Sequence, residues 1–60
     1  MLQVKYVVNG RVRFEKYFQQ TPILFEGMFV NYVGECYKVI SIVLKITDNT
    51  LFYIVNLEEC

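Results

Sequence analysis

The stretch that decides the fold runs from Cys36 to Leu57, CYKVISIVLKITDNTLFYIVNL. Its two halves are rich in β-branched and aromatic residues, which favour strands. They flank Asp48-Asn49, two residue types that tolerate the left-handed backbone of a tight turn. A two-residue turn at this dipeptide predicts a hairpin with one continuously apolar face. The apolar pairs on that face are Ile46 with Leu51, Leu44 with Tyr53, Ile42 with Val55 and Ile40 with Leu57.

The opposite face of this hairpin is also half apolar. The same register places Lys45 beside Phe52, Val43 beside Ile54 and Ser41 beside Asn56. One small domain has a single interior, and contiguous exposed apolar patches mark interaction sites. We therefore predict a protein-binding or dimer interface made of Val43, Phe52, Ile54, Phe29 and Ile40. The alternative is that the connection Gln19–Gly27, with Ile23, Leu24 and Phe25, folds over this face.

The rest of the chain shows the same pattern of short apolar runs separated by turn residues, and no helical period. The predicted strands are Leu2–Val7, Arg11–Phe18, Met28–Tyr32, Cys36–Thr47 and Thr50–Leu57. In the fourth strand the inward positions change from odd (Tyr37, Val39) to even (Ile42) numbers, which predicts a bulge or sharp bend near Ile40-Ser41.

These strands predict an all-β fold in one domain spanning residues 1–60. A long bent strand shared by two halves of a sheet is how small barrels close. The fold class that we expect is a small five-stranded antiparallel SH3-like barrel or a strongly bent meander. An OB-type barrel is less favoured, because no helix is predicted between the third and fourth strands.

The first hairpin leaves a choice of turn. A two-residue Asn9-Gly10 turn would pair even with odd positions and divide the apolar residues between the faces. A three-residue loop, Val8-Asn9-Gly10, keeps them together and gives Gly10 the positive φ of a bulge position. We therefore predict the three-residue loop, with Tyr6 opposite Val12 and Val4 opposite Phe14.

That register places Lys5 opposite Arg13, with Arg11 near the tip and Tyr17 farther along the same face. Like charges directly opposite each other are unfavourable, so an anionic partner could compensate them. The four residues are therefore a candidate anion-binding set. The simpler interpretation is that the cations make a strand face soluble and protect a sheet edge from aggregation.

Composition limits the cellular context. The chain is 55% hydrophobic with a net charge of +0, and no run approaches the ~20 apolar residues of a membrane span. Its N-terminus shows no signal-peptide pattern, so we expect a cytoplasmic protein without a membrane partner. Cys36 and Cys60 have no CxxC spacing and the chain has no histidine, which argues against zinc. One Cys36–Cys60 bridge remains an alternative to the reduced state that a cytosol favours.

Groups suited to catalysis are scarce. The chain has no histidine, its one aspartate, Asp48, falls in a predicted turn, and its one serine, Ser41, falls in a predicted strand with no base nearby. The three glycines form no phosphate-binding pattern. We expect no catalytic residues, no cofactor and no metal, and hence no enzyme.

Three functions remain. The favoured hypothesis is a protein-binding module, a homodimer that acts as a steric inhibitor or accessory factor of a larger protein target. A small chain without catalytic groups is typical of the inhibitors and accessory factors that phages and other mobile elements encode. The first alternative is a small-barrel nucleic-acid-binding protein that uses the basic first hairpin, although zero net charge counts against it. The second is a small-ligand binder with its pocket at a dimer seam.

Overall fold

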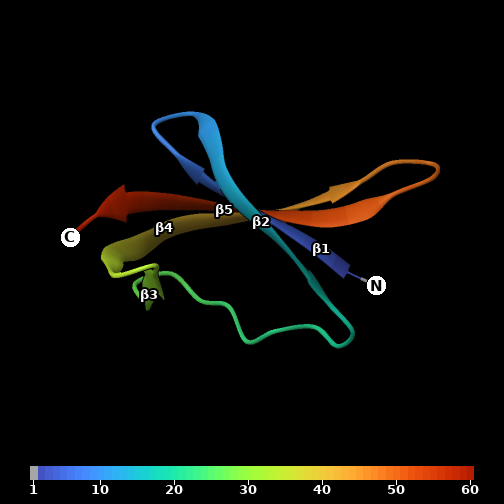
Figure 1. Cartoon of the computed structure of the whole chain (residues 1–60). Coiled ribbons are helices and arrows are strands. Elements are labelled where there is room, and N and C mark those ends of the chain that lie inside the picture. Colours follow the sequence, from blue (N-terminus) through green and yellow to red (C-terminus); the bar gives the residue numbers. More distant parts are fainter. Residues whose placement is uncertain (1) are drawn as a thin grey trace.

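The computed structural model describes residues 2–60 and contains five strands in one sheet (Figure 1). They are β1 (Leu2–Val8), β2 (Arg11–Phe18), β3 (Phe29–Tyr32), β4 (Glu35–Ile46) and β5 (Leu51–Glu59). The strand order across the sheet is β2-β1-β5-β4-β3. The sheet curls into a half-barrel, so the prediction of an all-β, five-stranded fold is confirmed.

The sheet is mixed, and the prediction of a purely antiparallel sheet is wrong at its centre. Strands β1 and β5 pair in parallel, with Val4 beside Tyr53 and Tyr6 beside Val55, whereas the other three pairings are antiparallel. Hairpin registers follow from local turn chemistry, but this pairing joins segments about 50 residues apart and no turn specifies it.

The β1–β2 hairpin has the shorter of the two turns considered. Val8 pairs with Arg11, and Asn9 and Gly10 have φ values of 53° and 78°, which is the two-residue geometry with both φ angles positive. The predicted three-residue loop is therefore wrong. A bulge corrects the parity instead, because Val7 pairs with Val12 and Tyr6 with Phe14, which leaves Arg13 as the extra residue.

The β4–β5 hairpin follows the predicted register over its outer part. The predicted pairs from Ile46–Leu51 through Ser41–Asn56 are confirmed. A bulge between Val39 and Ser41 then shifts the register, so that Val39 and not Ile40 pairs with Leu57. The bulge itself lies where the change of parity predicted it.

The core occupies one end of the half-barrel. Its buried residues come from three strands and are Val4, Tyr6, Tyr37, Val39, Val55 and Leu57. Leu24 and Met28, from the connection between β2 and β3, pack against this cluster. That connection therefore contacts the inner face of the sheet, the face opposite Phe52 and Ile54, since side chains alternate along β5.

Side chains join the two edge strands at the core end. The Phe14 ring of β2 stacks on Tyr32 of β3, with ring centres 3.8 Å apart, and on Tyr6 at 4.4 Å. The Lys16 ammonium lies 5.9 Å from the centre of the Tyr32 ring. The half-barrel is thus closed here by aromatic and cation–π contacts, because β2 and β3 are not neighbours in the hydrogen-bonded sheet.

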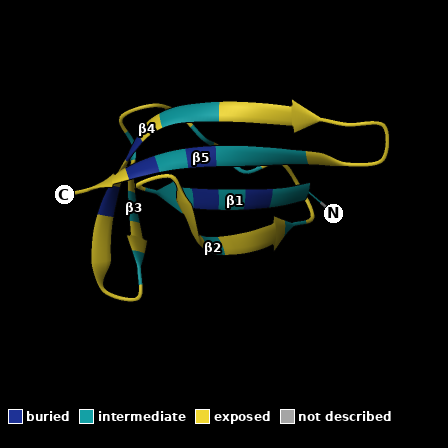
Figure 2. Ribbon diagram, turned by 90° about the horizontal axis from the view of Figure 1, so that it is seen from above, coloured by how far each residue is buried: buried dark blue, intermediate teal, exposed yellow. Residues whose placement is uncertain are grey.

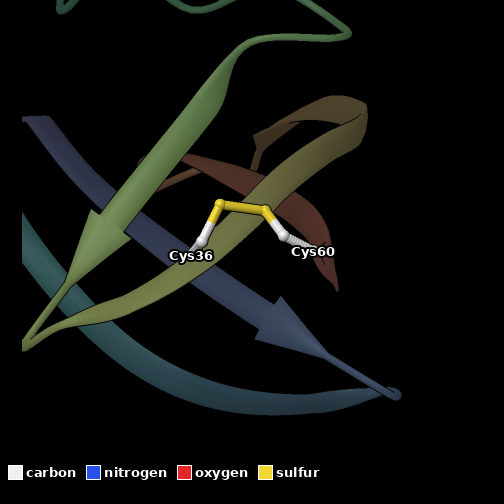
Figure 3. The surroundings of a disulfide bond; sticks show 2 residues. All are labelled: Cys36 and Cys60. Carbon is white, nitrogen blue, oxygen red and sulfur yellow. A yellow bond between two sulfur atoms is a disulfide. The ribbon is translucent and has the colours of Figure 1, made fainter.

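A disulfide fixes the same end (Figure 3). It joins Cys36 of β4 to Cys60, just beyond β5, with Cα atoms 5.5 Å apart, and the Cys60 amide donates a hydrogen bond to the Cys36 carbonyl at 3.1 Å. The reduced state that we favoured from the sequence is therefore not the one in the structure. Pairing of β5 to β4 continues as far as Cys60, which holds the two cysteines close together.

Candidate functional site

Exposed apolar side chains gather on the outer half of the β4–β5 hairpin, which extends away from the core (Figure 2). Leu44, Ile46 and Leu51 are 44%, 72% and 51% exposed. Alternation along the strands places them on the same face as buried Val55. The sequence predicts one continuously apolar face here, whereas the structure buries only the half of that face near the disulfide.

The reason is the length of the neighbouring strand. The pairing of β1 with β5 begins at Gln3 and Phe52, so Leu51 and the turn lie beyond it. Leu24, Val30 and Tyr32 pack against the buried cluster, whereas Leu44, Ile46 and Leu51 are not part of it. Leu44, Ile46 and Leu51 were missed as candidate site residues, because the apolar pattern alone cannot show where the covering elements stop.

The predicted interface residues divide into two groups. Val43, Ile54 and Phe52 share the outer face of the hairpin, where Val43 is 40% exposed and the other two are half-buried. Phe29 lies on β3 opposite Lys38, and Ile40 lies in the bulge between these two regions; both are exposed. The structure thus brings Val43, Phe52 and Ile54 together and leaves Phe29 toward the core end of the sheet.

A shallow groove of about 460 Å³ lies beside Phe52. The Lys5 ammonium is 4.7 Å from the centre of the Phe52 ring, and the Tyr17 hydroxyl accepts a hydrogen bond of 3.2 Å from Gln3 Nε2. The remaining lining residues, from the β4–β5 turn, are Asn49, Thr50 and Leu51. This groove offers two aromatic rings and one cation to a ligand.

The predicted anion-binding set is divided. Lys5 and Tyr17 line the groove, but Lys5 pairs with Glu15 and not with Arg13, which corrects the register on which the set was based. Arg13 Nη2 lies 3.5 Å from Glu35 Oε2. Arg11 lies beside the β1–β2 turn. The like-charge pair that called for an anionic partner is therefore absent from the described residues, and opposite charges face each other there.

Arg13, Glu35 and Tyr37 form a polar cluster near the disulfide. The Tyr37 hydroxyl donates a hydrogen bond to Glu35 Oε2, and this bond is the main cause of a raised pKa for Tyr37. The pKa of Arg13 is also raised, chiefly by its contact with Tyr37. The bulge in β2 supplies the arginine to this cluster, where it ties β2 to β4. Within residues 2–60, no group of three or more acidic or cysteine side chains is arranged to hold a metal ion.

Comparisons with protein-family models, curated proteins and solved structures found no match to this chain. None of its described elements is a helix long and apolar enough to cross a membrane.

Proposed function

We propose that this chain is a non-enzymatic protein-binding module that acts through the outer half of the β4–β5 hairpin. The observation that carries the proposal is that Leu44, Ile46 and Leu51 are exposed together on the part of the hairpin that protrudes from the core. Apolar surface gathered in this way marks contact sites on proteins. A module of this size would act on a larger protein by covering a surface, as an inhibitor or an accessory factor.

The test compares three baits in affinity capture from the source cells: the wild type, Ile46→Glu and Ile23→Glu. Ile46 and Ile23 are exposed isoleucines, 72% and 84% accessible, but Ile23 lies in the connection after β2, outside the hairpin. We expect a protein that the wild type and Ile23→Glu enrich equally and that Ile46→Glu loses, because the new charge would be buried unpaired. Equal enrichment by all three baits would overturn the proposal.

The groove beside Phe52 favours a second candidate function, the binding of single-stranded nucleic acid. Bases stack on exposed aromatic rings, and Tyr17 and Phe52 line the groove together with the Lys5 cation. Titration of a labelled oligonucleotide tests this candidate. We expect weak affinity that falls steeply with salt, since one lysine neutralises few phosphates, and Tyr17→Ala should reduce it further.

Two finer sequence-based expectations stay predictions. One is the SH3-like class of barrel, since the half-barrel has a parallel pair at its centre. The other is the cytoplasmic location, against which the Cys36–Cys60 bond counts, because disulfides persist in oxidising compartments and are rare in the cytosol.

A further inference from the structure

Among residues 2–60, β2, β3 and part of β4 each have an edge without a neighbouring strand, and these edges differ in how they are protected. The edge of β2 carries Arg11, Arg13 and Lys16, and β3 is only four residues long. The third edge is β4 from Ile40 to Ile46, because β3 pairs with β4 only as far as Lys38 and the hydrogen bonds of Gly27 and Met28 stop at Val39. Charges, bulges and short length protect sheet edges against further pairing, and beyond the bulge at Ile40 this third edge has only Lys45.

The hydrogen-bonding pattern shows which groups this edge presents. The Thr47 amide donates to the Thr50 carbonyl at 2.9 Å, so these two residues form a hydrogen-bonded pair. Such pairs alternate along an antiparallel ladder. The main-chain groups of Val43 and Lys45 therefore turn toward β5, and those of Ile42, Leu44 and Ile46 turn toward the free edge. Within residues 2–60, no backbone hydrogen bond reaches that edge outside the strand ladders.

The sequence of this edge, ISIVLKI from Ile40 to Ile46, is nearly symmetric about Val43. An antiparallel copy centred there places Val43 opposite its counterpart, Ile42 opposite Leu44, Ser41 opposite Lys45 and Ile40 opposite Ile46. The free main-chain groups of Ile42 and Leu44 then face one another, as an antiparallel ladder requires. Centring the pairing on Lys45 instead would oppose two lysines, and centring it on Leu44 would shorten the ladder.

We propose that two copies of this chain pair through the free β4 edge, antiparallel and in register about Val43, to form one continuous sheet. The proposal rests on the proposed protein-binding function and names a second copy as the first partner. A two-fold interface must be self-complementary, and this segment is complementary to itself in backbone parity and side-chain size, and this register opposes no like charges. The pairing also joins the Leu44, Ile46 and Leu51 surfaces of both copies into one apolar face for a larger target.

The test changes Val43, which the proposed register places opposite Val43 of the second copy. Light scattering should give the wild type twice the 7.1 kDa chain mass at high concentration. Val43→Lys and Val43→Glu should each weaken the dimer at least about tenfold, because like charges meet at the two-fold axis. An equimolar mixture of the two variants should recover the double mass as a heterodimer. Val12→Lys, on the exposed β2 edge, is the matched control and should dimerise like the wild type.

Three results would overturn the proposal: a wild type at the single-chain mass at every concentration, a Val43→Lys variant that dimerises normally, or a charged pair that stays monomeric when mixed. A folded β spectrum for each variant excludes unfolding as the cause. Oxidation of Val43→Cys should link two copies covalently, since paired Cα atoms lie about 4.5 Å apart, whereas Lys45→Cys should not link. These measurements contain no target protein, so a failed capture experiment leaves their outcome unaffected.

Discussion

The two halves of the β4–β5 hairpin have the same apolar character and opposite environments. In the half near the disulfide, Tyr37, Val39, Val55 and Leu57 are at most 3% exposed. In the half near the turn, Leu44, Ile46 and Leu51 are at least 44% exposed. The first half packs with β1, with β3 and with Leu24, whereas Leu44, Ile46 and Leu51 of the second half stay exposed, although β1 pairs with β5 as far as Phe52. The difference teaches that an apolar pattern identifies a face to be covered, and the rest of the fold decides how much of it the chain covers itself.

The largest contrast should come from placing the same charge in each half. Val55→Asp puts a carboxylate into the dry core and should unfold the domain, at a cost above about 4 kcal/mol. Ile46→Asp should change the free energy of unfolding of a single chain by no more than about 0.5 kcal/mol. Urea unfolding followed by circular dichroism, at concentrations that keep the chain monomeric, measures both. Similar losses in the two variants would remove the distinction between the halves.

The disulfide should account for much of the stability of the covered half. Cys36 and Cys60 are 24 residues apart, and closing a loop of that length corresponds to roughly 3 kcal/mol in the chain-entropy description. Reduction should lower the free energy of unfolding by about this amount. The Cys36→Ser, Cys60→Ser double variant is the control, because reductant should not affect it further. A wild type equally stable with and without reductant would contradict a structural role for the bond.

Alkaline pH should weaken the covered half selectively. Burial raises the pKa of Tyr6, and the hydrogen bond to Glu35 is the main cause of the raised pKa of Tyr37. A tyrosine with a raised folded-state pKa contributes stability below its unfolded value, about 10, and that contribution is lost as the pH rises through the folded value. Unfolding measured from pH 8 to 11 should show this loss. Tyr6→Phe should reduce the loss, because it removes one of these two hydroxyl groups, and a Tyr6→Phe variant with the same pH profile as the wild type would contradict this prediction.

The smallest expected effect concerns the turn that leads into the covered half. Asn9-Gly10 and Val33-Gly34 both have positive φ angles, but valine at 49° is unfavourable because its branched side chain crowds the backbone. Val33→Asn should therefore raise the free energy of unfolding by about 1 kcal/mol. Thermal unfolding measures the gain. Asn9→Val is the reciprocal variant and should lose a similar amount, and a Val33→Asn variant less stable than the wild type would show that the valine has favourable contacts.

The local parts of this structure could be read from the sequence. The Asp48-Asn49 turn, the pairing from Ile46–Leu51 through Ser41–Asn56 and the bulge near Ile40 all follow from alternation along adjacent segments. The Asn9-Gly10 turn could not be predicted from alternation. A three-residue loop and a two-residue turn followed by a bulge both keep the apolar residues of the hairpin on one face, and the structure has the second arrangement.

The non-local parts could not be predicted. No turn specifies the parallel β1–β5 pair, and the exposure of Leu44, Ile46 and Leu51 depends on where the pairing of β1 with β5 begins. The sequence therefore did not identify Leu44, Ile46 and Leu51 as candidate site residues. Val43, Phe52 and Ile54 were placed correctly on the outer face of the hairpin, although their role as an interface stays a prediction.

The parallel pairing of β1 with β5 has a consequence for synthesis on the ribosome. While residues 51–59 are still unmade, β1 and β2 have only each other, and an isolated two-stranded hairpin is at best marginally stable in water. Val4 and Tyr6 then stay exposed until their partners Tyr53 and Val55 emerge. The nascent chain should therefore remain unfolded and open to chaperones until synthesis of β5, and after release it should fold slowly for its size, because its central pairing closes the longest loop in the sheet.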